Sequence, residues 1–240
     1  MADYPGWYKY KDSDDAPDAN RVYREVLSKA PDKSVVICSV GFLTNMRRLL
    51  ETKGDEFSPL DGRALVEKKV KLWVAMACKY PSGKEYNSRH DAESSRYALE
   101  NWPTPVVISD FEYGKDCFAG RAIAESGIKS PIVDVYAGTL PSREAIKKKS
   151  ARYLRDAYGM AGRAAWDQTA VLAAVRGVDA YFNTERGIYR MVGTDGANEW
   201  APDEENGPHL RITEKLSKAE VGKIIDELML RVPQARSKCK

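Results

Sequence analysis

The amino-acid sequence predicts an α/β fold with a mainly parallel sheet flanked by helices and an antiparallel hairpin near the C-terminus. Three observations predict this fold. Short apolar runs rich in β-branched residues are typical of buried strands. Stretches with apolar residues at helical spacing alternate with these runs, which favours parallel strands covered by helices on both faces. Two further apolar runs lie close together near the C-terminus and indicate an antiparallel pair.

In the first half of the chain, helical and strand patterns follow one another in regular order. Buried strands are expected over three apolar runs, residues 34–40, 68–77 and 104–110. Helices are expected over four stretches, residues 19–30, 41–51 after a short turn, 91–101 and 114–126.

The second half adds helices and the expected antiparallel pair. Helical spacing is found over residues 142–159, 167–177 and 217–232, and in the last of these Ser217 and Glu220 have the spacing of a capping box. Residues 180–185 and 187–193 are expected to pair across a turn. Because we find no repeat, low-complexity tract or linker, we expect a single domain over residues 1–240.

Composition and charge limit the classes of function. A chain of 240 residues with 43% hydrophobic and 30% charged residues can bury a sizeable core. Its 38 basic and 35 acidic residues give a net charge of +3, which is too even to indicate a nucleic-acid or membrane-surface partner. The basic run over 145–155 is expected to be a solvated helix face. No apolar run approaches the ~20 residues that span a bilayer.

Cysteine usage and the first residues bear on the compartment. The four cysteines are far apart in the sequence, which favours buried thiols over a disulfide framework or a zinc site: Cys38, Cys78, Cys117 and Cys239. The first 15 residues lack the basic start and apolar centre of a signal peptide. The sequence therefore gives no compartment. A cytoplasmic location is the default expectation, and export is the alternative if an N-terminal segment outside this sequence carries a signal peptide.

Polar residues follow each of the three predicted strands. They lie at 41–45, at 79–87, and at Asp110 and Glu112. Ligands of parallel sheets bind beyond the carboxyl ends of the strands, so these are candidate site positions. At the first, the ordinary alternative is that Thr44 or Asn45 caps the next helix.

The letters KEYN contain the most specific of these polar groups. In an extended segment alternate side chains share a side, so Glu85 and Asn87 would form a polar pincer while Tyr86 packs the other way. A solvated loop is the alternative.

A fourth candidate position precedes the apolar helix over 167–177. Asp167 is placed to be its N-cap or, functionally, a carboxylate ligand for a hard cation. Trp166 is either a core residue or a flat face for a ring. His90 and His209 lie in polar stretches and are expected to be exposed.

Four segments together resemble the inosine-uridine-preferring nucleoside hydrolase family. VVICSVGFLTN is similar to the family's strand and G-P-L-T-N turn, with Phe42 in place of Pro. YPSGKEYNSRHDAESSRYAL resembles its A-E-F-N segment followed by D-P-E-A-A, and WDQTAVLAAV resembles its metal-ligand Asp and following helix. GIYRMVGTDGANEW resembles its C-terminal hairpin, although Asp195 and Asn198 alone read as turn residues. The resemblance extends from about Ala16 to the end.

The resemblance implies a role for each matched position. Glu85 and Asn87 match residues that bind ribose hydroxyls, and Asp167 and the backbone carbonyl of Thr44 match calcium (Ca²⁺) ligands. Trp166 stands where the family's purine-preferring branch has a Trp, which implies a purine nucleoside as substrate. Lys79 stands where many members have a ribose-binding Asn.

One part of the family pattern does not occur in this chain. The family opens with an apolar strand and a D-x-D-x-x-x-D-D cluster, which supplies the other calcium ligands and the catalytic base. The segment KDSDDAPDA follows no apolar run, and we expect an acidic loop in which Asp18 begins the next helix. The chain therefore resembles an N-terminally truncated nucleoside hydrolase, to which we assign no catalytic base. An open sheet edge and association of copies are also expected.

Three functions remain open at this point. The first is a hydrolase that cleaves the N-glycosidic bond of ribonucleosides with a calcium-bound water. The second is a non-catalytic ribose- or nucleoside-binding protein. The third is a structural or assembly partner. The sequence leaves open whether the protein forms a homo-oligomer.

Overall fold

The computed structural model describes residues 13–139 and 162–231, which divide into two units. The first unit comprises Met1–Gly114 and Trp166–Lys215, and the second comprises Lys115–Ala165 and Leu216–Lys240, within the described ranges. The helix predicted over 142–159, its basic run and Cys239 lie outside the described residues. The single domain expected from the sequence stays a prediction.

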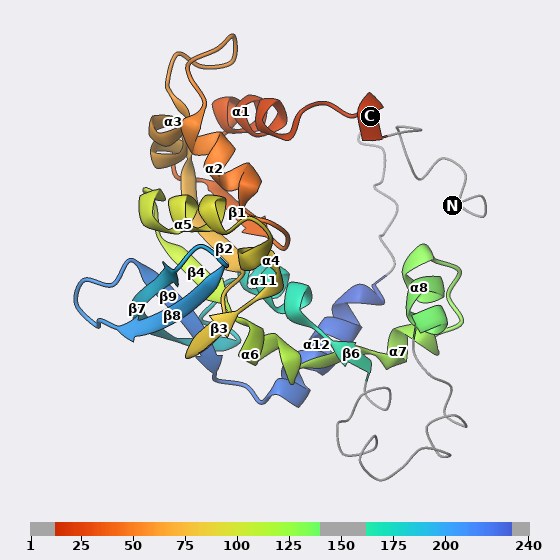
Figure 1. The fold of residues 1–240 in the computed structure, drawn as a ribbon. Coiled ribbons are helices and arrows are strands. Elements are labelled where there is room, and N and C mark those ends of the chain that lie inside the picture. The colour runs from red at the N-terminus through yellow and green to blue at the C-terminus, as the bar shows by residue number, and fades with distance from the viewer. Residues whose placement is uncertain (1–12, 140–161, 232–240) are drawn as a thin grey trace. The chain divides into compact units, whose positions relative to one another are not determined.

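A seven-stranded sheet of order β1-β2-β4-β9-β7-β8-β3 forms the centre of the first unit (Figure 1). Its central part is parallel and joins β1 (Val35–Ser39), β2 (Val70–Met76), β4 (Val106–Ser109) and β9 (His209–Glu214). Antiparallel pairing adds β7 (Phe182–Val192), β8 (Ala197–Pro202) and β3 (Ser82–Lys84). The α/β fold predicted from the sequence is confirmed.

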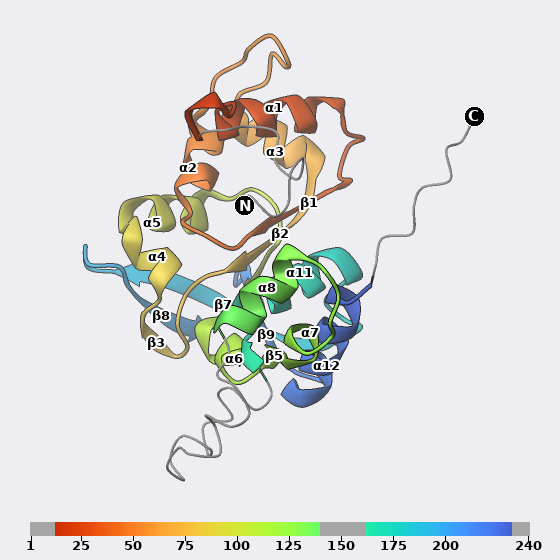
Figure 2. The same cartoon turned by 90° about the vertical axis from the view of Figure 1, so that its right-hand side faces the viewer.

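Helices cover both faces of this sheet (Figure 2). One layer contains α1 (Ala19–Lys29), α2 (Thr44–Glu51), α3 (Gly62–Lys69) and α5 (Ala92–Asn101). On the other face α11 (Trp166–Arg176) packs against β1, β2 and β4. The core between the layers contains fully buried apolar side chains, among them Leu27, Leu49, Trp73 and Ile108.

Aspartates begin three helices of the first unit. Asp18 caps α1, as predicted, and accepts hydrogen bonds from the backbone N–H groups of Asn20 and Arg21. Asp61 and Asp91 cap α3 and α5 in the same way. Short side-chain acceptors satisfy the free N–H groups of a first helical turn, so these residues fix where each helix starts. In the described part of the acidic segment before α1, Ser13–Asp15 form the short 3₁₀ helix η1.

Two predicted elements are wrong. Residues 114–126 are not one helix, because α6 (Phe111–Lys115) is followed by β5 (Phe118–Gly120) and α7 (Arg121–Ala124). Gly120 has φ 106°, a left-handed conformation that a right-handed helix cannot include.

The segments 180–185 and 187–193 do not pair with each other either, because they form the single strand β7. Gly187 is not a turn residue but lies within the strand, paired with Pro202 of β8 and His209 of β9. The hairpin near the C-terminus therefore joins β7 and β8 through residues 193–196. Asp195 lies in that turn, whereas Asn198 is a buried residue of β8.

The second unit joins β5 to β6 (Gly162–Ala164) and to the helices α7, α8 (Pro131–Thr139) and α12 (Lys218–Met229). Ser217 and Glu220 form the predicted capping box at the start of α12. The backbone N–H of Gly120 donates to Asp226 of α12 at 2.6 Å. A small apolar core contains Ile123, Val133 and Tyr136.

Strand β1 is the terminal strand of the sheet, and its outer edge is unpaired among the described residues. Exposed valines lie on β1 and the two helices beside it: Val22 and Val26 of α1, Val36 and Val40 at β1, and Val171 and Val175 of α11. The described residues therefore include the exposed apolar surface that was expected at this edge. In the described ranges, no helix has the length and apolar character that crossing a membrane requires.

Candidate functional site

A cavity of about 320 Å³ lies in the first unit, beyond the carboxyl ends of β1, β2 and β4. We call it the aromatic pocket, and it is lined by Val40, Met76, Glu85, Tyr86, Asn87, Phe111, Trp166 and Asp167. This is where ligands of parallel sheets bind. Four of the six site residues predicted from the sequence line it: Glu85, Asn87, Trp166 and Asp167.

Glu85 and Asn87 are brought together by a helix start rather than by an extended segment. Glu85 is the N-cap of α4 (Tyr86–His90), and its carboxylate accepts hydrogen bonds of 2.9 Å from the backbone N–H groups of Asn87 and Ser88. The pincer geometry inferred from alternate spacing is therefore wrong, although both residues reach the pocket. Tyr86 does not pack away from it, since its side chain is 58% exposed and also lines the pocket.

The Glu85 and Asn87 side chains differ in what they can still bind. Glu85 is buried, which raises the pKa of its carboxyl, and its Oε2 also accepts from the Ser88 hydroxyl at 3.1 Å. Asn87 Nδ2 donates to the carbonyl oxygen of Met76 at 3.0 Å. Its amide oxygen has no hydrogen-bond partner in the described part of the chain, so it is available to accept from a ligand hydroxyl.

Trp166 is held as one side of the pocket by Phe111 and Gly114. Its indole N–H donates to the backbone carbonyl of Phe111 at 3.0 Å, and the two rings stack with centroids 5.4 Å apart. A Cβ on Gly114 would lie 2.6 Å from Trp166 Cα, so only glycine allows this close approach. With its N–H engaged, Trp166 offers a ligand its aromatic surface.

Asp167 lies in the first turn of α11, which begins one residue earlier at Trp166, so its predicted role as the N-cap is wrong. A negative charge is favoured in this turn by the helix dipole. Burial by the surrounding protein raises the pKa of the carboxyl. It also raises the pKa of the Cys38 thiol to about 11, and the charge of Asp167 adds to this effect.

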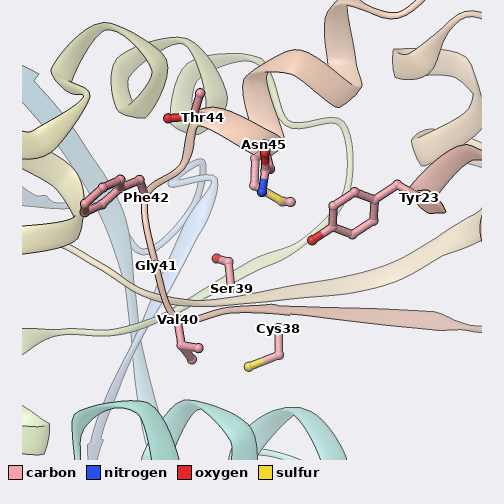
Figure 3. Close-up of a pocket in the computed structure, with 9 residues that line it drawn as sticks. Tyr23, Cys38, Ser39, Val40, Gly41, Phe42, Thr44 and Asn45 are labelled. Carbon is pink, nitrogen blue, oxygen red and sulfur yellow. The ribbon is translucent and has the colours of Figure 1, made fainter. Parts of the chain in front are cut away.

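Thr44 lines a second cavity of about 320 Å³, which shares Val40 with the aromatic pocket. In Figure 3 the Tyr23 hydroxyl points into this cavity, while Cys38 and Val40 point from β1 toward α11. The Thr44 hydroxyl donates to Asp91 at 2.6 Å. Neither Thr44 nor Asn45 caps α2, because the N-cap position is Leu43 and has no side-chain cap bond.

Lys79 is beside the aromatic pocket but does not line it. Its ammonium nitrogen lies 5.2 Å from the ring centroid of Phe111. The side chain of Asn198 holds its backbone, with Oδ1 accepting from the Lys79 N–H at 2.9 Å and Nδ2 donating to the Lys79 carbonyl at 2.8 Å.

The described residues do not by themselves fit a calcium ion. No three His, Cys, Asp or Glu side chains in the described ranges could hold a metal together. Calcium takes six to eight oxygen ligands, whereas Asp167 is the one pocket carboxylate that is not already engaged as a helix cap. The roles of Asp167 and Thr44 as calcium ligands stay predictions.

Sequence reasoning missed Phe111, which lines the pocket. Its neighbours Asp110 and Glu112 were candidate site positions but do not line the pocket. Asp110 is fully buried and accepts hydrogen bonds from the Tyr189 hydroxyl and from Arg211 Nε. Glu112 accepts from the backbone N–H of Tyr80 at 2.9 Å. The one signal that could have identified Phe111 is its position shortly after β4. An apolar residue at such a position is usually interpreted as a core residue.

The two histidines also differ from each other. His90 is exposed, as expected. His209 is buried in β9, where Nδ1 accepts from the backbone N–H of Tyr189 and Nε2 lies 3.2 Å from the carbonyl of Leu99. The expectation of exposure is therefore wrong for His209, and burial lowers its pKa. Of the cysteines, Cys78 and Cys117 are buried free thiols and Cys38 is half-buried.

Comparison with solved structures identifies the class of fold as that of the nucleoside hydrolases. No protein-family model and no curated protein sequence matches the chain. A plant nucleoside hydrolase, the PpNRh1 enzyme, is similar with a TM-score of 0.61 and 16% identity over 93% of this chain and 70% of that one. An inosine-uridine-preferring nucleoside hydrolase from Bacillus anthracis has a TM-score of 0.54 and 16% identity over 89% of this chain and 65% of that one.

A third similar structure is the type III effector protein XopQ in complex with adenosine diphosphate ribose. Its TM-score is 0.59, with 15% identity over 88% of this chain and 64% of that one. The chain thus spans 64% to 70% of the length of these three proteins. At such identities the likeness shows the nucleoside hydrolase fold.

Proposed function

We propose that this protein binds a ribonucleoside in the aromatic pocket and acts as a nucleoside hydrolase that cleaves the N-glycosidic bond. The observation that carries the proposal is that Glu85, Asn87, Trp166 and Asp167 line one pocket at the strand ends. The nucleoside hydrolase fold of the chain supports it.

The polar side of the pocket suits the ribose. Hydroxyl groups that leave water need replacement hydrogen bonds. The free amide oxygen of Asn87 and the carboxylates of Asp167 and Glu85 are acceptors for such hydroxyls. Cleavage of an N-glycosidic bond builds positive charge on the ribose ring, and a carboxylate such as that of Asp167 would stabilise this charge.

The aromatic side of the pocket suits the base. Tyr86, Phe111 and Trp166 supply ring surfaces, and stacking on such side chains contributes about 1–3 kcal/mol per base. We propose a purine because its larger ring system gains more from stacking on Trp166. Trp166→Ala should therefore weaken the binding of inosine more than that of uridine. Equal losses for both ligands, or no loss, would contradict this preference.

A second candidate function, a non-catalytic nucleoside-binding protein, is favoured by two observations. The Glu85 carboxylate already accepts three hydrogen bonds, and the described residues include no group of three metal-binding side chains. The adenosine diphosphate ribose bound to XopQ is also a ribosyl compound, which supports this wider ligand class.

Two measurements on the same protein separate these functions. Calorimetry with inosine measures binding, and release of free hypoxanthine, with and without added Ca²⁺, measures hydrolysis. Asp167→Asn should lower base release, whereas Glu204→Gln, a change of an exposed acid outside the pocket, should not. We expect slow base release, because we assign no catalytic base among the described residues and such a base contributes ~10²–10⁴-fold. Binding without any base release supports the second candidate, and absence of binding contradicts both.

A further inference from the structure

Lys79 is a cation that is held in place beside the aromatic pocket. Asn198, which is 1% exposed, bonds both the N–H and the carbonyl of Lys79, so the backbone at this position has little freedom. The stem of the side chain lies against Gly83 of β3, where a Cβ would come within 2.8 Å of Lys79 Cδ. The direction of the side chain is therefore constrained by this strand.

The ammonium group of Lys79 has no carboxylate partner among the residues that the structure describes. Its one described contact is with the Phe111 ring, at 5.2 Å from the centroid. A cation over a ring gains about 0.5–2 kcal/mol. This ring contact does not use the N–H donors of the ammonium in hydrogen bonds to oxygen, so they can still bind a ligand. Glu85 forms no ion pair with the Lys79 ammonium. Its carboxylate instead accepts hydrogen bonds at the start of α4.

We propose that Lys79 selects a ribosyl ligand that carries a phosphate group, so that a nucleoside phosphate binds more tightly than the neutral nucleoside. This inference rests on the proposed function, since it places the ribose and base in the aromatic pocket. A neutral nucleoside offers an ammonium group no counter-charge, whereas a phosphate oxygen forms a charge-assisted hydrogen bond with it.

The charges around the pocket also set where such a phosphate would lie. Asp167 repels an anion at its own end of the pocket. Phe111 contacts both sides of the site, because its ring stacks on Trp166, the residue before Asp167, and lies 5.2 Å from the Lys79 ammonium. The phosphate is therefore expected beside the Phe111 wall, with the ribose hydroxyls toward Asn87 and Asp167.

Titrations with inosine, inosine 5′-monophosphate and inorganic phosphate test this inference. Wild type should bind the monophosphate about 10- to 100-fold more tightly than inosine, the range expected for one charge-assisted hydrogen bond. Added salt should reduce this advantage because it screens the charges. Lys79→Met keeps the stem and should abolish the advantage of the monophosphate over inosine, and Lys79→Arg should keep most of it.

Lys71→Met is the matched control, because Lys71 is exposed on β2 at the end away from the pocket, and it should change neither affinity. Thermal unfolding of each variant shows that it is folded. Equal affinity of wild type for inosine and its monophosphate, or an advantage that survives Lys79→Met, overturns the inference while the proposed function stands. Inorganic phosphate that binds as tightly as the monophosphate also overturns it. If neither inosine nor the monophosphate binds, the proposed function fails as well.

Discussion

The carboxylate of Glu85 accepts a hydrogen bond of 2.9 Å from the backbone N–H of Asn87. This bond joins the two residues at the start of α4. The Glu85 side chain, which caps the helix, also lines the pocket. One carboxylate thus serves both the fold and the candidate site. A substitution of Glu85 should therefore affect stability and binding together.

Glu85→Ala should destabilise the protein by about 1–3 kcal/mol, because three donors lose their acceptor in a buried place. Urea unfolding measures this loss. Glu85→Gln keeps one acceptor oxygen and should lose less. If Glu85→Ala were as stable as wild type, the carboxylate would not be the cap that holds α4.

Arg211 is nearly buried and should be important for stability. Its Nε lies 3.1 Å from the fully buried carboxylate of Asp110, and Arg211→Met would leave that charge without a cation. We expect a loss of about 3–5 kcal/mol in unfolding free energy. Glu185→Gln is the control, because Glu185 pairs with the same Arg211 from the exposed surface and should change stability by less than about 1 kcal/mol. Equal effects of the two substitutions would contradict this difference.

Acid should weaken the protein in part through Asp55. The Arg24 guanidinium holds both carboxylate oxygens of Asp55 and, with the backbone N–H groups of Ser58 and Phe57, lowers its pKa from 3.8 to about 2. Because the folded-state pKa is the lower one, this contribution is complete above about pH 4 and is lost as the pH falls toward about 2. Asp55→Asn should remove that part of the pH dependence of unfolding free energy. An unchanged pH profile in the variant would contradict the assignment.

The edge of β1, which has no partner strand within residues 13–139 and 162–231, should make copies of the chain associate. Strands without charged or proline residues at an open edge are prone to pair with other chains. Val26→Lys together with Val36→Lys places two charges on the exposed apolar surface and should shift the protein toward the monomer in sedimentation experiments. Ile128→Lys, on an exposed residue of the second unit, is the control. A monomeric wild type would contradict the prediction.

Local pattern predicted three of the four parallel strands, because β1, β2 and β4 are mainly apolar in the sequence. It did not predict β9, which contains charged residues. The strands β5 and β6 have three residues each, too few to show a period, so their pairing could not be read. The burial of His209 depends on Tyr189 and Leu99, which are remote in sequence. Glu85 and Asn87 were found by residue type, but the helix that joins them was not.

The measurement that tests the account most directly is the indole N–H resonance of Trp166 in a nitrogen-15 spectrum, assigned with Trp166→Phe, during a titration with inosine. We expect a saturable shift of this resonance, because Trp166 lines the aromatic pocket. Trp102 is the internal control, since its indole N–H donates to Thr104 away from the pocket and should not shift. A Trp166 resonance that stays in place at saturating inosine, or that moves no more than that of Trp102, would contradict the claim that a nucleoside binds there.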